Sequence, residues 1–539
     1  MKLLELLRRE STASVGALLV LAGLAGISNA LVLAVINASA TKASTGDRST
    51  RDIVLFAIIM AAYAVSQWKL YSSATSEIEK ILDRIRIRLA DKIRRCDLLP
   101  LETLGQTVIY AGITRDTTTI SQAATLVIMA AQAAVLVVFT ALYVAVLSLV
   151  AFGLTAAIAV FLSILHLRRA REMGKVMHEL SIRENDMFDS LTHFLDGFKE
   201  VRMNRARSDD LFAHFTGISH EATERKCYTH QQIARTFIFS QLSFYLLLGV
   251  IVFVVPKLSQ TQSASVVKTT TAVLFLVGPI TTLVGTVPNL TVADTAVENI
   301  RDLETALDKS LSEGFDRFSP ARKFREIAFE NVVFHYHDTD SGGAFTVGPI
   351  SLTLKAGETV FIAGGNGSGK STFLKLLTAL YHPQQGVIRV DGRALTPESF
   401  ESYRSLFSTV FTDYHLFDRL YGLSDLPQEA IDQQLELVEL TEKTQIVDSR
   451  FETLELSGGQ RKRLALMVSL LENRPICMFD EMAADQDPAF RKKFYKEIVP
   501  FLRTNGRTVI AVTHDDKYFG DADRLLRMDE GRFVSDEQV

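Results

Sequence analysis

Residues 364–372 read Gly364-Gly365-Asn366-Gly367-Ser368-Gly369-Lys370-Ser371-Thr372. This stretch fits G-x-x-x-x-G-K-[ST], a glycine-rich loop that cradles phosphates with its backbone N–H groups. The apolar run Thr359–Ala363 before it predicts a buried strand, and Ser371–Leu380 predicts the helix that follows. Strand, glycine loop and helix in this order are the context that the motif requires. We therefore expect a bound nucleotide, with Lys370 at its β- and γ-phosphates and Ser371 as a ligand of Mg²⁺.

Two carboxylates and a histidine follow other apolar runs. Pro475–Phe479 predicts a buried strand that ends in Asp480 and Glu481, and Thr508–Thr513 predicts another that ends at His514. We expect Asp480 on the Mg²⁺ side, Glu481 beside the attacking water and His514 at the γ-phosphate. A solvated acidic turn and a structural histidine are the plain alternatives. The glycine loop upstream favours the catalytic interpretation.

Composition divides the chain in two. Nearly all the long apolar runs of the 539 residues lie in the first 300. The net charge of −4 offers no overall basic surface for nucleic acid. Three scattered cysteines argue against a disulfide framework or a cysteine metal site. We expect an α-helical transmembrane domain at residues 1–300, a charged linker at 301–325 and an α/β P-loop ATPase domain at 326–539.

Six apolar runs are long enough to cross a bilayer, which takes about 20 residues of helix. They lie at residues 15–36, 53–70, 121–144, 147–167, 237–255 and 269–292. Gly278-Pro279, Gly285 and Pro288 interrupt the last run, which predicts a kink in that helix. A cleaved signal peptide is the competing interpretation of residues 1–40, but the apolar stretch is too long for a signal core.

Basic clusters orient the six predicted spans. They lie at the N-terminus, at residues 80–95 after the second span and at 168–175 after the fourth. Alternating spans place all three clusters on one side, which the positive-inside rule makes cytoplasmic. The N-terminus, the ATPase domain and two long helical connections are then cytoplasmic, in a bacterial inner membrane. Turns near Leu98–Gln106 and Leu195–Asn204 are expected to pass force to the spans.

Few ionisable residues fall within the spans, which disfavours ion-coupled transport. We expect an apolar, hydroxyl-rich cavity that Phe237, Phe239, Phe244, Tyr245 and Phe275 could line, although contact with lipid or neighbouring helices is their more ordinary role. The short segment before the first span leaves no room for a leader-cleaving protease domain, so we expect no trimming of a peptide by this chain.

A pentapeptide completes the ATPase pattern, Leu456-Ser457-Gly458-Gly459-Gln460. With Lys370, Asp480, Glu481 and His514 in this order, the chain resembles the ABC transporter superfamily over essentially its whole length. The resemblance implies a head-to-tail dimer, in which each ATP lies between one Gly364–Thr372 loop and the pentapeptide of the other copy. Six spans with one ATPase domain then look like a half-transporter that works as a homodimer in membrane lipid.

The resemblance also implies three further binding residues. Tyr336 would stack on adenine, with a strand-face aromatic as the alternative. Thr412 occupies the place of the family's Mg²⁺-contacting glutamine, where Asp413 could act through water instead. Asp487 keeps the acid that ends the loop after Glu481, although Asp485-Gln486 replaces the usual small and apolar pair.

The segment Asp448–Glu455 lacks the glycine-containing acidic motif of multidrug exporters. With the run Val410–Asp418, this departure looks most like the bacterial exporters of cyclic peptides and peptide siderophores, including exporters of pyoverdine precursors. The expected function is ATP hydrolysis coupled to export of such a substrate by alternating access. A lipid or multidrug exporter is the first alternative, and an ATP-gated sensor without transport is the second. An importer is disfavoured because spans and ATPase share one chain.

Overall fold

The computed structural model separates into two compact units, Met1–Lys92 with Gly105–Asp308, and Ile93–Leu104 with Lys309–Val539. It describes residues 2–11, 15–44, 50–158, 160, 161, 164, 187, 190–254, 263–312, 319, 321, 323–337 and 344–539. We call the first the helical unit and the second the ATPase unit.

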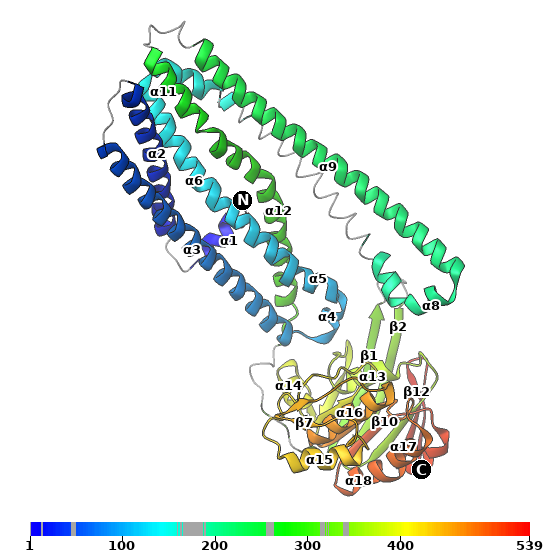
Figure 1. The fold of residues 1–539 in the computed structure, drawn as a ribbon. Coiled ribbons are helices and arrows are strands. Elements are labelled where there is room, and N and C mark those ends of the chain that lie inside the picture. Colours follow the sequence, from blue (N-terminus) through cyan, green and yellow to red (C-terminus); the bar gives the residue numbers. More distant parts are fainter. Residues whose placement is uncertain are drawn as a thin grey trace. The chain divides into compact units, whose positions relative to one another are not determined.

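Helices of very different length build the helical unit (Figure 1). They are α1 (Lys2–Glu10), α2 (Val15–Ser44), α3 (Thr50–Arg95), α5 (Gln106–Ala111), α6 (Thr117–Leu147), α8 (Phe198–Met203), α9 (Arg205–Phe253), α11 (Ser263–Leu274) and α12 (Val277–Asp308). A π-helical turn, η1 (Gly112–Asp116), joins α5 to α6. The helix α6 packs against α2 and α12, and α1 packs against α12.

Four stretches of the described chain are long and apolar enough to span a membrane: Val20–Ser39, Thr50–Arg95, Gln106–Leu147 and Lys268–Asp308. They match the first, second, third and sixth predicted spans. The fifth prediction falls in α9, where the apolar helix Gln241–Val250 is shorter, and part of the fourth lies outside the described residues. The count of six therefore stays a prediction.

The predicted kink in the last span is a break between two helices. The helix α11 ends at Leu274 and α12 begins at Val277, directly before Gly278-Pro279. Proline fits the first turn of a helix, where its missing N–H has no partner to lose. Pro288 lies within α12 without ending it, and α12 continues to Asp308, into the stretch predicted as linker.

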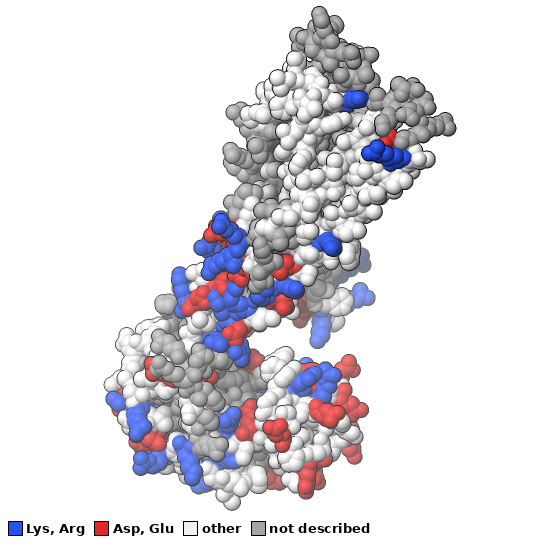
Figure 2. Space-filling model, turned by 90° about the vertical axis from the view of Figure 1, so that its left-hand side faces the viewer, with Lys and Arg blue, Asp and Glu red and all other residues white. Residues whose placement is uncertain are grey.

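The surface of the helical unit suits contact with lipid. Ile53, Ile58, Val65 and Trp68 of α3 are all exposed. Figure 2 shows charged residues gathered toward one end of this unit, with little charge on the rest of its visible face. Phe244 is buried with Leu33, Val144 and Ala272, and Phe275 packs on the same cluster, so these two rings serve helix packing.

Two large sheets and a two-stranded hairpin lie in the described part of the ATPase unit. The six-stranded sheet has the order β12-β11-β3-β10-β9-β6, and all neighbours except β11 and β12 are parallel. Its strands are β3 (Thr359–Ala363), β6 (Phe407–Val410), β9 (Ile476–Asp480), β10 (Thr508–Val512), β11 (Arg524–Asp529) and β12 (Arg532–Gln538). A four-stranded antiparallel sheet contains β1 (Glu326–His337), β2 (Ala344–Lys355), β4 (Gln385–Val390) and β5 (Arg393–Ala394).

Helices and a short hairpin complete this unit: α4 (Leu98–Leu104), α13 (Lys370–Leu377), α14 (Phe400–Arg404), α15 (Gln428–Leu437), α16 (Gly458–Leu471), α17 (Pro488–Lys493), η4 (Phe494–Ile498), α18 (Val499–Thr504), β7 (Ile446–Val447) and β8 (Arg450–Phe451). The strand β1 continues through bulges near Val332 and a positive φ of 50° at Asn331.

The central strands are buried on both faces because alternate residues enter two different cores. Phe361, Phe479 and Ala511 belong to one cluster with α15 and α16, while Ile362, Met478 and Ile510 belong to another with α13. Side chains of a strand alternate between its faces, so a fully apolar strand is what a sheet covered on both sides requires. This double burial fixes the carboxyl ends of β3, β9 and β10 at one edge of the sheet.

Candidate functional site

The glycine loop joins β3 to α13, as predicted. Lys370 is 6% exposed and its Nζ donates to the carbonyls of Gly364 and Gly365, at 2.9 and 2.8 Å. Burial lowers the pKa of Lys370, and the nearby Glu481 and Asp480 oppose this shift. Gly369 has a φ of 100° at the start of α13, and Thr372 lies in the first turn. The loop can therefore present N–H groups, a helix start and a cation to phosphates.

Position 364 of the loop requires glycine because the backbone of Met528 lies close to it. A Cβ on Gly364 would lie 2.2 Å from the carbonyl oxygen of Met528 and 2.8 Å from Ser368 Oγ. The Ser368 carbonyl accepts a hydrogen bond from Gly531 N–H at 2.9 Å. The end of β11 and the turn after it therefore pack against the glycine loop and support it.

Asp480, the last residue of β9, is 2% exposed. Ser371 Oγ donates to Asp480 Oδ2 at 3.2 Å. Burial raises the pKa of Asp480, and hydrogen bonding from Thr412 and Ser371 offsets part of that rise. Two oxygens so close together suit Mg²⁺, which takes oxygen ligands and completes its shell with waters and phosphate.

Glu481 and His514 lie side by side because they follow neighbouring parallel strands. Asp480 pairs with Val512, and Glu481 N–H donates to the Val512 carbonyl at 3.1 Å. The His514 Nε2 lies 3.1 Å from Glu481 Oε1. Glu481 has a φ of 53°, an uncommon value for a residue other than glycine. The buried Lys462 Nζ supports this conformation by donating to the Glu481 carbonyl at 2.7 Å.

Thr412 lies just after β6, the strand that pairs in parallel with β9. Its side chain and backbone lie close enough to the Asp480 carboxyl to offset part of the rise in the pKa of that group. A threonine at this position therefore keeps contact with the acid expected on the Mg²⁺ side, although its reach is shorter than that of a glutamine.

The pentapeptide begins α16 with a capping box. Ser457 Oγ accepts from Gln460 N–H at 3.4 Å, and Gln460 Oε1 accepts from Ser457 N–H at 3.0 Å. Gly458 and Gly459 form the first turn, and a Cβ on Gly459 would lie 2.8 Å from the Asp485 carbonyl. Their N–H groups open a helix start suited to an anion. Among the described residues, no hydrogen bond or ion pair joins Ser457–Gly459 to the Gly364–Thr372 loop.

The other two predicted binding residues have visible structural roles. Asp487 caps α17, accepting from Ala489 N–H and Phe490 N–H at 3.0 Å each, and it pairs with Arg463. Tyr336 lies near the end of β1, opposite Phe345 of β2, and is 40% exposed. Contact of either residue with a nucleotide stays a prediction.

Sequence reasoning missed the role of Gln486. Its Nε2 donates to the Gly459 carbonyl at 3.0 Å, and its Oε1 accepts from Arg463 Nε at 2.8 Å. The unusual Asp485-Gln486 pair thus ties the loop after Glu481 to the start of α16. The sequence feature that could have indicated these contacts is the pair of adjacent basic residues Lys462 and Arg463, shortly after the pentapeptide.

A second missed cluster surrounds α4, which groups with the ATPase unit although it follows α3 in the chain. Glu102 bonds to Lys375 Nζ at 2.9 Å and to the Tyr381 hydroxyl at 2.6 Å. Burial and then Glu102 raise the pKa of Tyr381 to about 12. Asp97 lies 3.5 Å from Arg404. Since Lys375 lies on α13, the predicted turn at 98–106 contacts the helix that carries Lys370 and Ser371.

Comparisons with known proteins agree with this geometry. The family model described as ABC transporter matches residues 347–484. The "ATP-binding protein SyrD" of Pseudomonas syringae pv. syringae is 34% identical over 477 residues, which cover 85% of this chain and 83% of that protein. The chain belongs to the ABC transporter family. The prediction of this family from the pentapeptide and its partner residues is confirmed.

Other relatives of this ABC transporter match a shorter part of it. The "ATP-dependent lipid A-core flippase" of Alkalilimnicola ehrlichii is 34% identical over 221 residues, 39% of this chain and 37% of that protein.

A solved structure titled "Structure of a bacterial Atm1-family ABC exporter with ATP bound" covers 99% of this chain and 95% of its own, with a TM-score of 0.75 and 19% identity. The ABC exporter fold is therefore confirmed. Membership of the ABC transporter family confirms an ATP hydrolase coupled to transmembrane transport.

Proposed function

We propose that the chain is a half-transporter that works as a homodimer and exports a peptide-like substrate from the cytoplasm across a bacterial inner membrane. The substrate class would be a cyclic peptide or a peptide siderophore precursor. Support comes from the run Val410–Asp418 and from the segment Asp448–Glu455, whose departures from the multidrug pattern resemble that group of exporters.

The dimer is inferred because the proposed ATP-binding residues lie in two separate groups. Lys370, Ser371, Asp480, Glu481 and His514 gather at one edge of the sheet, while the capped start of α16 has no bond to the glycine loop among the described residues. A second copy would supply the missing half-site. Ser371 and Asp480 would hold Mg²⁺, which would neutralise phosphate charge when bound.

Closure of two ATPase domains around ATP would drive alternating access. ATP shifts such an equilibrium only by its greater affinity for the closed state. Contacts of Ser457 and the following N–H groups with the second copy's nucleotide would exist only in that state. The Glu102 contacts with α13 would then pass the closure to α3, because α4 continues the chain directly from α3.

The test is uptake of purified candidates into inverted membrane vesicles that contain the protein. We expect ATP-dependent accumulation of a cyclic peptide, less of its linear form, and none in Lys370→Ala vesicles. Accumulation of a fluorescent phospholipid or a hydrophobic drug instead would reassign the substrate. ATP hydrolysis without uptake of any candidate class would favour a sensor and contradict export.

A further inference from the structure

Two buried lysines lie at the candidate ATP site. Among the lysines and arginines that the structure describes, only Lys370 and Lys462 are buried, at 6% and 2% exposed. A lysine is almost never fully buried without a partner that compensates its charge. Lys370 has an expected partner in the phosphates of the nucleotide. Lys462 of α16 has no such role, so its burial requires another explanation.

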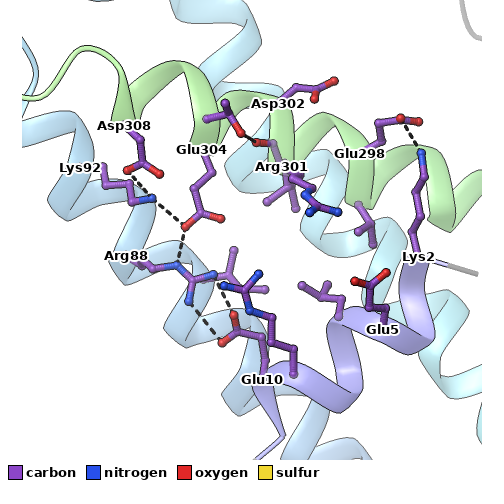
Figure 3. Close-up of a pocket in the computed structure, with 16 residues that line it drawn as sticks. Lys2, Glu5, Glu10, Arg88, Lys92, Glu298, Arg301, Asp302, Glu304 and Asp308 are labelled. Carbon is purple, nitrogen blue, oxygen red and sulfur yellow. Dashed lines mark hydrogen bonds and ion pairs between the residues drawn. The ribbon is translucent and has the colours of Figure 1, made fainter.

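The contacts of Lys462 differ from those of the cations that join helices elsewhere in the chain. Arg88 of α3, for example, bonds to the Glu304 carboxylate of α12 at 2.7 Å (Figure 3). The shortest contact of Lys462 is instead a backbone carbonyl, that of Glu481, at 2.7 Å. Its acidic partner, Asp485, lies at 3.3 Å with a side chain that is 70% exposed. Because exposed carboxylates contribute little to an ion pair, the carbonyl is the main partner of this ammonium group.

The carbonyl of Glu481 lies at a bend that the backbone does not favour. Glu481 has a φ of 53°, in the left-handed region that residues other than glycine rarely adopt. The same carbonyl accepts from Ala484 N–H at 3.1 Å, which closes a turn directly after β9. A hydrogen bond from an ammonium group is stronger than one between neutral groups. Lys462 therefore stabilises this bend where the side chain of Glu481 leaves the backbone.

The helix α16 holds Lys462 closely against this bend. Lys462 and Arg463 follow Gly459 by three and four residues, so all three lie on one face of the helix. A Cβ on Gly459 would lie 2.8 Å from the Asp485 carbonyl, which shows how closely this face approaches the loop after Glu481. The ammonium group is thus carried by a packed helix.

We infer that Lys462 is a positioning residue for ATP hydrolysis. Its ammonium group fixes the backbone of Glu481 and thereby orients the carboxylate that takes a proton from the attacking water. This inference rests on the proposal that Glu481 is the base. Ser457, which would contact the nucleotide of the second copy, begins the same helix. Lys462 therefore attaches the base of one ATP site to the helix that serves the other site.

Steady-state hydrolysis by the full-length protein tests this role. Lys462→Met keeps an unbranched chain in the buried position and leaves the Glu481 carbonyl its bond from Ala484. Since a displacement of about 1 Å at a reacting group can cost a factor of about 100, we expect kcat to fall by roughly 10- to 100-fold. The KM for ATP and the amount of ATP retained should not change, because no group that binds the nucleotide is altered. Lys492→Met, at an exposed position of α17, is the matched control and should keep the parent kcat.

A double-mutant cycle shows whether Lys462 acts through Glu481. Residues that work through one group have effects that do not add. In the Glu481→Gln background, Lys462→Met should therefore cause no further loss of hydrolysis. The same fold loss in both backgrounds would show an independent effect and overturn the inference. Undiminished turnover in Glu481→Gln alone is a different result, which would contradict the proposed base itself.

Two further results would overturn the role of Lys462. They are an unchanged kcat in Lys462→Met, and a loss of ATP retention that accompanies the loss of kcat, since the latter indicates a purely structural contribution. The unfolding temperature shows whether Lys462→Met folds. If it does not, Lys462→Gln, which keeps one N–H donor of shorter reach, is measured in its place. It should show the same division, with kcat reduced and KM unchanged, and the same two results would overturn the inference.

Discussion

Glu481 is held at three points. Its N–H bonds to Val512, its carbonyl accepts from Lys462, and its carboxylate lies 3.1 Å from His514. The φ of 53° at this residue is uncommon for a residue other than glycine. The backbone therefore orients the carboxylate that we propose as the catalytic base.

Replacing this carboxylate should separate ATP binding from hydrolysis. In Glu481→Gln the amide cannot accept a proton from water, so hydrolysis should fall by about 100-fold or more. ATP should remain bound, because no phosphate-binding group is changed. Radiolabelled ATP retention and phosphate release check both points. Undiminished turnover would remove Glu481 from the role of base.

Substitution of Thr412 tests whether this side chain, which is shorter than that of glutamine, contributes to Mg²⁺ binding. Thr412→Ala removes the hydroxyl that offsets part of the rise in the pKa of Asp480. Loss of one hydrogen-bonding group of this kind is worth about 1 kcal/mol, or roughly fivefold in an equilibrium. The Mg²⁺ concentration for half-maximal hydrolysis should rise by that factor. Thr412→Ser keeps a hydroxyl and should behave like the parent. An unchanged Mg²⁺ dependence in Thr412→Ala would assign that task to another group, with Asp413 the first candidate.

At the scale of elements, the sequence predicted best what is local. The buried strand, glycine loop and helix at 359–377 follow from neighbouring residues, so they were predictable. The bulges of β1 could not be predicted locally, because they depend on pairing with β2 and β4. The role of Gln486 depends on Gly459 and Arg463, which no local pattern places beside it.

The loop after Glu481 and the start of α16 should act as one element. Gln486→Leu leaves the Gly459 carbonyl and Arg463 Nε without this partner, which costs about 1–3 kcal/mol when such groups are buried. We expect a lower unfolding temperature for the ATPase unit and weaker ATP hydrolysis. Calorimetry and phosphate release measure these, with the exposed Gln433→Leu of α15 as the matched control. Equal behaviour of the two variants would show that the tie contributes nothing.

The contact of α4 with α13 should couple hydrolysis to transport. Glu102→Lys places two ammonium groups together in place of the 2.9 Å ion pair with Lys375. Since this pair is partly exposed, stability should change by no more than about 1 kcal/mol. Vesicle uptake should fall while basal hydrolysis persists, and adding Lys375→Glu should recover part of the uptake. Uptake that is unchanged in Glu102→Lys would contradict this role of α4.

The whole molecule is proposed to be a pair of chains, because no hydrogen bond or ion pair of the described residues joins the two proposed halves of the ATP site within one chain. Lys370 belongs to the proposed phosphate-binding half of the ATP site, and Ser457 belongs to the proposed pentapeptide half. Substitution of either residue disables its half, and the arrangement of the substitutions in a dimer decides which sites survive. A site shared between copies and a site within one copy give opposite results.

The decisive measurement is ATP retained per dimer in the Glu481→Gln background, with two affinity tags to isolate mixed dimers. Lys370→Ala on one copy and Ser457→Ala on the other should leave one intact site and one retained ATP. Both substitutions on a single copy should leave none. The reverse, retention only when both lie on one copy, would place each ATP site within a single chain and contradict the shared site.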